Sequence, residues 1–464
     1  MKLLTKNNYP DAKPSPSSLK LRFNERVIGW LLFSYSLLLL VTGLLSESPG
    51  TLISGLQRIF YAPSALLTDY MELASPGTAL FNAGLMTLFY LLVLKLSGIR
   101  LRGTVLAAFF MLSGFSLFGK NLFSALPISL GVLLFSLVFR RDFRDLVLQS
   151  LFGACLGPLV SQVAFHFDLP LWAGLIYACL LGVATGFILP SLTAVIGDFH
   201  QGYSLYNMGL AAGLYSAVVV SILSFAGADF IRPQIVYEMK SPFLIIWLAA
   251  VLLALLILGI LTRFLAPTVE QERTPQGQNE DQDGLVPTYG RLLKASGRLV
   301  SDYVDDCGIG LTLINMSLSG LAAMAYALLI AGYLNGPIMG AILSVVGFAA
   351  YGKHPRNILP IMIGVHLTIL LSGADILPTN AVIYGLLGTN LAPLAGHFGF
   401  IPGVLAGMIH MTFVGRVSAL HCGVNLYNNG LSGGLVAIVF VPMLNLLEQK
   451  EMLPRQLWRR IRRN

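Results

Sequence analysis

The sequence predicts an all-α, polytopic integral membrane protein built from two related halves. Hydrophobic residues fill 55% of the 464 positions and charged residues only 11%, whereas roughly a quarter of the residues in a soluble domain are charged. The mean hydropathy is +0.74. Long apolar segments recur along the chain, and two distant stretches resemble each other. These observations place the protein in a lipid bilayer.

A helix needs about 20 apolar residues to cross the hydrocarbon core of a membrane. We find about fourteen apolar segments, of which about twelve to fourteen should span. The segments at 104–118, 336–350 and 400–415 are short or interrupted, so they are candidates for re-entrant or tilted pieces. The full set is 27–45, 78–97, 104–118, 122–139, 146–165, 171–190, 204–225, 243–263, 309–332, 336–350, 357–373, 379–395, 400–415 and 424–446.

Lysine and arginine crowd both ends of the chain, so the positive-inside rule predicts that both termini are cytoplasmic. A stretch rich in Gln, Glu, Asp, Pro and Gly lies between the halves and reads as a solvated linker. The predicted organisation is a basic cytoplasmic tail (1–26), a first span with its external connection (27–67), a first membrane repeat (68–226), a connecting span (227–266), a hydrophilic cytoplasmic linker (267–290), a second membrane repeat with a leading amphipathic segment (291–446) and a basic cytoplasmic tail (447–464).

The two predicted repeats align without gaps over 69–131 and 302–364, at an offset of 233 positions. Nineteen of the 63 aligned residues are identical, where composition alone gives roughly one in ten. An odd number of spans separates the copies, so the second should be inverted relative to the first. Inverted-topology repeats are typical of secondary transporters and channels, whose site lies at the midplane between the repeats.

A polar motif also occurs twice. "HQGYSLYNMGLAAG" at 200–213 matches "HCGVNLYNNGLSGG" at 421–434. Tyrosine and asparagine offer uncharged hydrogen-bonding groups, and glycine allows close backbone approach. The alternative is that these glycines and asparagines serve helix packing. His200 and His421 are candidates for an entrance or pore lining, or for a capping role. The predicted substrate-binding residues are Tyr206, Asn207, Gly209, Tyr427, Asn428 and Gly430.

Charged residues recur at matching places in both copies. Asp69, Glu72, Asp302 and Asp305 precede the first span of each copy and are candidates for ion or proton coupling. The alternative is that they complement the N-terminus of the following helix. Lys120 and Lys353 each follow a glycine and are candidates for lining the pore or entrance and holding an anionic group, or for snorkelling to the interface.

Other classes of function find little support. We see no hydrolase, metalloprotease or P-loop motif, and so predict no enzyme, no catalytic residues, no metal and no cofactor. The four cysteines have no C-x-x-C spacing and read as packing residues. Basic tails facing an anionic leaflet explain the net charge of +8 without nucleic acid. The expected partners are the lipid bilayer and a small polar solute, with a homo-oligomer left open.

The elements D-Y-x-[DE], F/Y-G-K, L-P-I and L-Y-N-x-G-L, spread over nearly the whole chain, resemble a bacterial family of multi-spanning membrane proteins known only as a domain of unknown function. That resemblance implies a location in the bacterial plasma membrane. In plan, an inverted repeat with Pro-broken segments is also similar to urea-type channels, from which no residue or substrate is carried over. The predicted function is transport or channelling of a small polar solute at a midplane site formed by both repeats. The alternative is an integral membrane enzyme or accessory protein acting on a lipid-linked or small intramembrane substrate.

Overall fold

The computed structural model describes residues 16–265 and 288–461. The fold is helical almost throughout, which confirms the predicted all-α polytopic class. Within the described ranges, ten helices are long and apolar enough to cross a membrane, and three shorter apolar helices cover 103–115, 122–138 and 336–348. Large apolar side chains such as Trp30, Phe225 and Leu329 are exposed on the outer surface, which suits contact with lipid rather than water.

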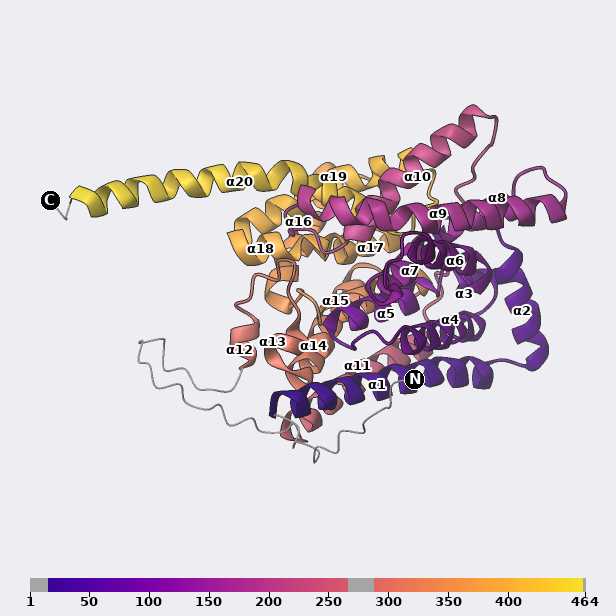
Figure 1. Cartoon of the computed structure of the whole chain (residues 1–464), viewed down its shortest axis with the longest axis horizontal. Coiled ribbons are helices and arrows are strands. Elements are labelled where there is room, and N and C mark those ends of the chain that lie inside the picture. The colour runs from indigo at the N-terminus through magenta and orange to yellow at the C-terminus, as the bar shows by residue number, and fades with distance from the viewer. Residues whose placement is uncertain (1–15, 266–287, 462–464) are drawn as a thin grey trace, which may run out of the picture.

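The first half of the fold, residues 16–225, begins with a long helix along one side of the molecule and ends with helices on the opposite side (Figure 1). Its elements are α1 (Pro16–Ser46), α2 (Pro49–Tyr61), β1 (Leu67–Thr68), α3 (Tyr70–Leu73), α4 (Pro76–Ser97), α5 (Gly103–Phe115), α6 (Leu122–Val138), η1 (Phe143–Asp145), α7 (Val147–Gly153), η2 (Ala154–Leu156), α8 (Gly157–Phe165), α9 (Leu171–Phe199) and α10 (Asn207–Phe225).

The second half, residues 242–461, follows the short strand β2 (Gln234–Ile235), which pairs in parallel with β1, and its helices come in a similar but not identical order. Its elements are α11 (Pro242–Leu265), α12 (Tyr289–Leu292), α13 (Tyr303–Cys307), α14 (Ile309–Ile330), α15 (Gly336–Phe348), α16 (Pro355–Ser372), α17 (Pro378–Gly388), η3 (Thr389–Leu391), α18 (Ala392–Phe398), α19 (Phe400–Leu420) and α20 (Asn428–Ile461).

Every predicted apolar segment coincides with helix. The segments at 104–118 and 336–350 form helices of 13 residues each, as expected for pieces too short to span. The segment at 400–415 is longer than predicted, because α19 continues for 21 residues to Leu420. The predicted linker at 267–290 lies outside the described residues except for its last three, and residues 1–15 and 462–464 of the predicted tails also lie outside them.

The sequence analysis missed α2. Ser48 caps this helix by accepting a hydrogen bond from Thr51 N, and Pro49 occupies its first turn, both of which favour helix initiation. Leu52, Gly55 and Ile59 form its buried stripe, while its other face is exposed. At 13 residues and with an apolar stripe on only one side, α2 reads as a surface helix rather than a span.

Corresponding helices of the two halves make corresponding contacts. A Cβ added to Gly43 of α1 would meet Gly77 O of α4, and one added to Gly259 of α11 would meet Gly310 O of α14. Gly77 and Gly310 are themselves 233 positions apart. The first span and the connecting span therefore occupy corresponding places.

Two short helices, α5 and α15, lie side by side in the middle of the molecule (Figure 1), and all 13 residues of each are buried. They run antiparallel, because Gly103 at the start of α5 meets Ala350 beyond the end of α15, and Gly336 at the start of α15 meets Leu117 beyond the end of α5. Both sequences lack charged residues, so burial on every side costs no ionic desolvation. This pair joins the halves at the core.

Candidate functional site

A second junction between the halves forms where α10 crosses α20. A Cβ on Gly209 would lie 2.8 Å from Gly430 Cα, and a Cβ on Gly430 would lie 2.8 Å from Gly209 Cα. One turn further on, Gly213 packs against Leu431 and Gly434 packs against Leu210. Each contact thus has a reciprocal partner at an offset of 221 positions. Only glycine lets the two backbones approach this closely.

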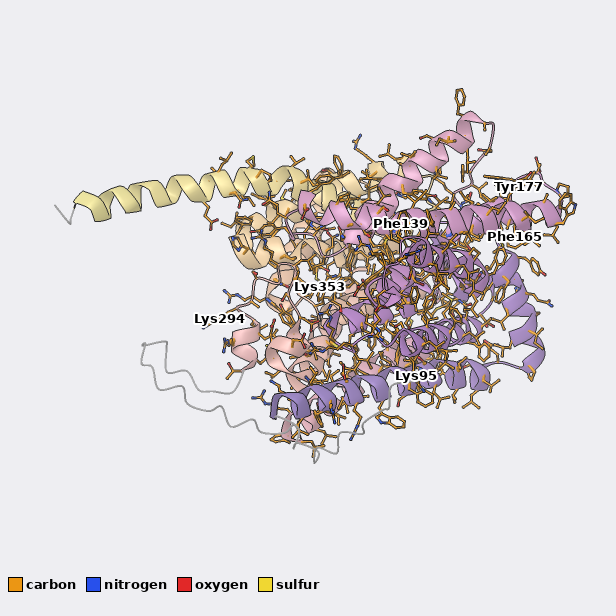
Figure 2. The ribbon with its side chains drawn as sticks, in the orientation of Figure 1. Lys95, Phe139, Phe165, Tyr177, Lys294 and Lys353 are labelled. Carbon is orange, nitrogen blue, oxygen red and sulfur yellow. The ribbon has the colours of Figure 1, made fainter. Side chains whose placement is uncertain are left out.

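The crossing places one tyrosine from each half at the junction, immediately before α10 and α20. Tyr206 Oη lies 2.6 Å from Ser344 Oγ on α15 and accepts a 2.7 Å hydrogen bond from Lys353 Nζ. The Lys353 ammonium also lies 4.6 Å from the ring centroid of Tyr206 and 5.3 Å from that of Phe348, within the range of cation–π attraction. Lys353 lies inside the bundle, whereas Lys95 and Lys294 lie at its surface (Figure 2).

The corresponding lysine of the first half meets the tyrosine of the second half. Lys120 Nζ lies 5.6 Å from the ring centroid of Tyr427 and 5.8 Å from that of Phe115. Both Lys120 and Tyr427 are buried, yet neither Lys120 Nζ nor Tyr427 Oη has a hydrogen-bond partner. Met111 stands where the second half has Ser344, so Tyr427 Oη has no counterpart of that hydroxyl, and Lys120 Nζ lies over the Tyr427 ring without bonding its oxygen. The first-half pair therefore lacks the hydroxyl that completes the network of the second.

The predicted asparagines make matching intramolecular bonds. Asn207 Oδ1 lies 3.2 Å from His200 Nε2 while its Nδ2 donates to Thr193 O at 3.1 Å. Asn428 does the same with His421 at 3.0 Å and Val414 O at 3.0 Å. The predicted histidines and asparagines thus fasten each turn to the preceding helix, and both histidines are buried. Gly202 and Gly423 take positive φ of 78° and 77° in these turns, a conformation that glycine adopts without strain.

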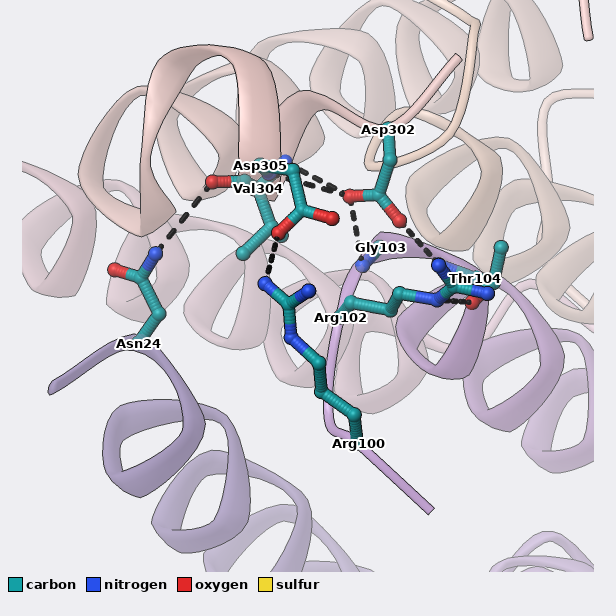
Figure 3. A network of polar contacts seen from close by, with 8 residues as sticks. All are labelled: Asn24, Arg100, Arg102, Gly103, Thr104, Asp302, Val304 and Asp305. Atoms are coloured by element: carbon teal, nitrogen blue, oxygen red, sulfur yellow. Dashed lines mark hydrogen bonds and ion pairs between the residues drawn. The ribbon is translucent and has the colours of Figure 1, made fainter. Parts of the chain in front are cut away.

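The acidic residues of the second half lie at the start of α5. Asp302 accepts backbone hydrogen bonds from Gly103 N at 3.0 Å and Thr104 N at 3.3 Å, as well as from Val304 N at the start of α13 (Figure 3). Burial raises the pKa of Asp302 above its ordinary range, and these N–H donors oppose the shift. Asp305 instead forms a 2.5 Å ion pair with Arg100 that is partly exposed (Figure 3).

Asp69 occupies the equivalent place at the start of α15. It accepts from Met71 N at 2.9 Å, and from Gly336 N and Tyr237 N at 3.2 Å each. Burial raises the pKa of Asp69 to about 7, with the three backbone donors again opposing the shift. Glu72 is exposed. Each buried aspartate therefore holds the N-terminus of the central helix that belongs to the other half.

The structure also reveals a polar cluster in the second half that the sequence analysis did not single out. His410 Nε2 lies 3.1 Å from Asn429 Oδ1 and its Nδ1 lies 3.1 Å from Ser432 Oγ. Asn390 Nδ2 donates to Asn429 O at 2.9 Å. The sequence did show that His410, Asn429 and Asn390 are polar residues inside predicted spans. It did not show that they contact one another, because they lie on three different elements, α19, α20 and η3, and hydrophobic periodicity does not predict contacts between elements. No group of metal-ligating side chains occurs within residues 16–265 and 288–461.

Two cavities differ in their distance from these residues, and neither is lined by the four lysines and tyrosines of the junction. A cavity of about 10 Å³, lined in part by Phe115, Leu426 and Asn429, lies beside the Tyr427 side of the junction. A much larger groove of about 760 Å³ opens between α1 and α4, with Trp30 among its apolar residues and Arg26 among its charged ones. The groove lies away from the glycine crossing and is open to the outer surface.

The fold and this buried junction define a multi-pass helical membrane protein in which two similarly ordered halves meet through reciprocal contacts. The chain belongs to the family described as "Protein of unknown function (DUF1576)", whose model matches residues 48–225 and 282–446. The two matched stretches fall on the two halves of the fold, which confirms the resemblance to a family of unknown function. No curated protein and no solved structure matches the chain.

Proposed function

We propose that the protein is a transporter or channel for a small polar solute, with its site at the buried junction of the two halves. The observation that carries this proposal is the pair of lysine–tyrosine contacts at that junction, each joining a loop of one half to the turn before α10 or α20 in the other. Buried, charged and hydroxyl-bearing groups at the centre of a membrane protein usually serve function.

We further propose that the halves are inverted-topology repeats. Three pairs of contacts support this relation: Gly209 with Gly430, the antiparallel pairing of α5 with α15, and the crossed capping of these two helices by Asp302 and Asp69. A twofold axis produces self-matching contacts of this kind. When such an axis lies in the membrane plane, equivalent half-elements from opposite faces meet at the midplane.

Within the proposed site, the glycines and tyrosines keep the roles expected from the sequence. Gly209 and Gly430 allow the crossing, and Tyr206 and Tyr427 present hydroxyl groups at it. Asn207 and Asn428 already use both ends of their carboxamides within the chain. We therefore assign them to positioning the adjacent tyrosines rather than to direct contact with the solute.

Reconstitution into proteoliposomes tests the proposal. Solute uptake or osmotic swelling would be measured for a panel of small neutral and anionic solutes against protein-free vesicles. Tyr206→Phe removes one oxygen atom and with it the bonds to Ser344 and Lys353, so it should reduce flux at least about tenfold if this junction lies on the path. Flux that equals that of protein-free vesicles for every solute would refute the proposal.

The cellular placement that fits this function is a bacterial plasma membrane with both chain ends in the cytoplasm. The first turn of α1, the short helix α12 and the last turns of α20 lie toward one end of the molecule, and α2 lies toward the other (Figure 1). Predicted cytoplasmic segments thus gather at a single end, which supports the positive-inside assignment.

The groove between α1 and α4 favours a second candidate function. Its apolar wall includes Trp30 and Phe33. Its charged residues are the basic Arg26, Lys95 and Arg100 and the acidic Glu25, and this basic excess suits a lipid-linked substrate with an anionic head. Such a protein would bind its substrate from the bilayer. Native mass spectrometry of the wild type and of an Arg26→Gln, Lys95→Gln variant would test it, with retained anionic lipid in the wild type alone as the expected result and equal retention as the contrary one.

A further inference from the structure

We propose that Lys120 and Tyr427 form a binding site for a small monovalent anion at the junction of the two halves. As an assignment of the solute class, the inference rests on the proposed function. As a binding site, it stands on the geometry of two unpaired hydrogen-bond donors.

The first step is the state of the two donors. Lys120 is fully buried and Tyr427 is 2% exposed, and Lys120 Nζ and Tyr427 Oη both lack a hydrogen-bond partner. Neither Lys120 nor Lys353 takes part in the ion pairs formed by the described residues. A buried ammonium without a counter-charge is costly. A bound anion would supply that charge and accept from both donors.

The surroundings of Lys120 also favour negative charge. Lys120 directly precedes Asn121, the N-cap of the 17-residue helix α6. A Cβ on Gly157, the first residue of α8, would lie 3.2 Å from Lys120 Cβ. Tyr427 directly precedes α20. The N-termini of α6 and α20 therefore begin next to the pair, whereas α8 continues directly from η2. The N-terminal ends of helix dipoles attract anions.

Comparison with the second half explains why the site belongs to the first. Lys353 donates to Tyr206 Oη, which is also bonded to Ser344 Oγ. Those three side chains satisfy one another. The first half has Met111 at the position of Ser344, and a thioether is only a weak acceptor. Unlike Lys353 and Tyr206, Lys120 and Tyr427 do not bond each other either, so both donors remain for a ligand.

The size of the ligand is limited by the enclosure of the two donors, because Lys120 and Tyr427 are both buried and neither side chain lines the small cavity nearby. Phe115 packs on the Tyr427 ring at a centroid distance of 4.8 Å and also lines the cavity of about 10 Å³. A cavity of that size holds about one water molecule. A halide, or an oxyanion of a few atoms such as nitrate, fits this scale, whereas a sugar acid such as gluconate does not.

The test is anion-dependent thermal unfolding of the full-length protein, purified in detergent and sodium gluconate. Replacing gluconate by chloride, bromide or nitrate at constant ionic strength should raise the unfolding midpoint by about 2 °C or more. Tyr427→Phe, which removes a single oxygen, and Lys120→Met should each abolish the rise. Tyr303→Phe is the matched control, because Tyr303 Oη is also buried without a partner but lies next to Asp302, and this variant should keep the response.

Equal midpoints in gluconate and in the small anions, or an unchanged anion response in Tyr427→Phe, would overturn the site. If Lys120→Met does not fold, the Tyr427→Phe result decides alone. Flux measurements distinguish failure of the anion site from failure of the transport function. An anion response without any solute flux would refute the transport function but support the anion site. Flux of neutral solutes without an anion response would refute the anion site but support the transport function.

Discussion

Gly209 and Gly430 touch each other at the crossing of α10 and α20, although 221 positions separate them in the chain. Each is the counterpart of the other in the repeated motif, so the contact joins one position to its own copy. A contact of that kind is what the proposed twofold relation between the halves requires. The same crossing brings Tyr206 and Tyr427 against the opposite half, which makes it the point on which the proposed site depends.

Leucine in place of Gly209 should destabilise the fold by about 1–3 kcal/mol, the usual effect of overpacking, because even a Cβ would lie 2.8 Å from the Gly430 backbone. The midpoint of thermal unfolding in detergent measures the change. Gly415→Leu on α19 is the control, since a Cβ there meets nothing within 4 Å. Equal midpoints for the two variants would count against close packing at the crossing.

Asn428→Leu should lower the yield of monodisperse protein. The change leaves His421 Nε2 and the Val414 carbonyl without their partner, and each buried group left unpaired costs about 1–3 kcal/mol. Asn445→Leu, on the same helix at a partly exposed position, should express normally. Yield is measured by size-exclusion chromatography. A normal yield of Asn428→Leu with abolished transport would instead place this asparagine in contact with the solute.

Asp302→Asn should destabilise the protein by about 1–3 kcal/mol, because the amide presents N–H groups toward the backbone donors Gly103 N and Thr104 N. Asp305→Asn removes only a partly exposed ion pair with Arg100 and should cost less than about 1 kcal/mol. Chemical or thermal unfolding of both variants distinguishes them. The reverse order of stabilities would show that the cap at α5 is dispensable.

Asp69 should make stability depend on pH. Its pKa of about 7 in the folded protein lies above the ordinary 3.8, so the folded state binds this proton more tightly than the unfolded state. The stabilisation is fully present below about pH 4 and is lost as the pH rises through about 7. The unfolding midpoint should therefore fall between pH 5 and pH 8, and fall less in Asp69→Asn. A parallel pH profile in the two proteins would assign the dependence to other groups.

Sidedness can be read by cysteine labelling in a background in which Cys155, Cys179, Cys307 and Cys422 are replaced. Gln57→Cys on α2 and Lys294→Cys just after α12 occupy exposed positions on elements at opposite ends of the molecule (Figure 1). A membrane-impermeant maleimide should label Gln57→Cys in intact cells and Lys294→Cys only after permeabilisation. The opposite pattern would reverse the proposed orientation.

Apolar segments were predictable because lipid imposes one simple requirement, a helix of sufficient length and hydrophobicity. Both 13-residue central helices were recognisable as too short to span. The helix α2 was missed because a one-sided apolar stripe carries a weaker signal than a continuous apolar run. The extension of α19 to Leu420 was missed because Arg416 interrupts the hydrophobic pattern.

The repeated motif pointed to the residues that meet at the crossing of α10 and α20, but not to the contacts that each of them makes. Sequence similarity placed Tyr206, Asn207 and Gly209 together, yet whether Asn207 bonds a solute or His200 depends on the direction of its side chain. The partners of Lys120 and Lys353 lie in the opposite half, more than 140 positions away. Contacts between halves depend on the packing of the complete chain, which no local pattern encodes.

The enclosed position of α5 sets an order for biogenesis. This helix leaves the ribosome long before α15, its central neighbour, and before Asp302, which accepts the N–H groups at its start. A translocon releasing the first half alone would deliver to the bilayer a segment too short to cross it, with its N-terminal donors unsatisfied. We therefore expect maturation of the first half to wait for synthesis of the second, with the chain becoming one cooperative unit when α15 is inserted.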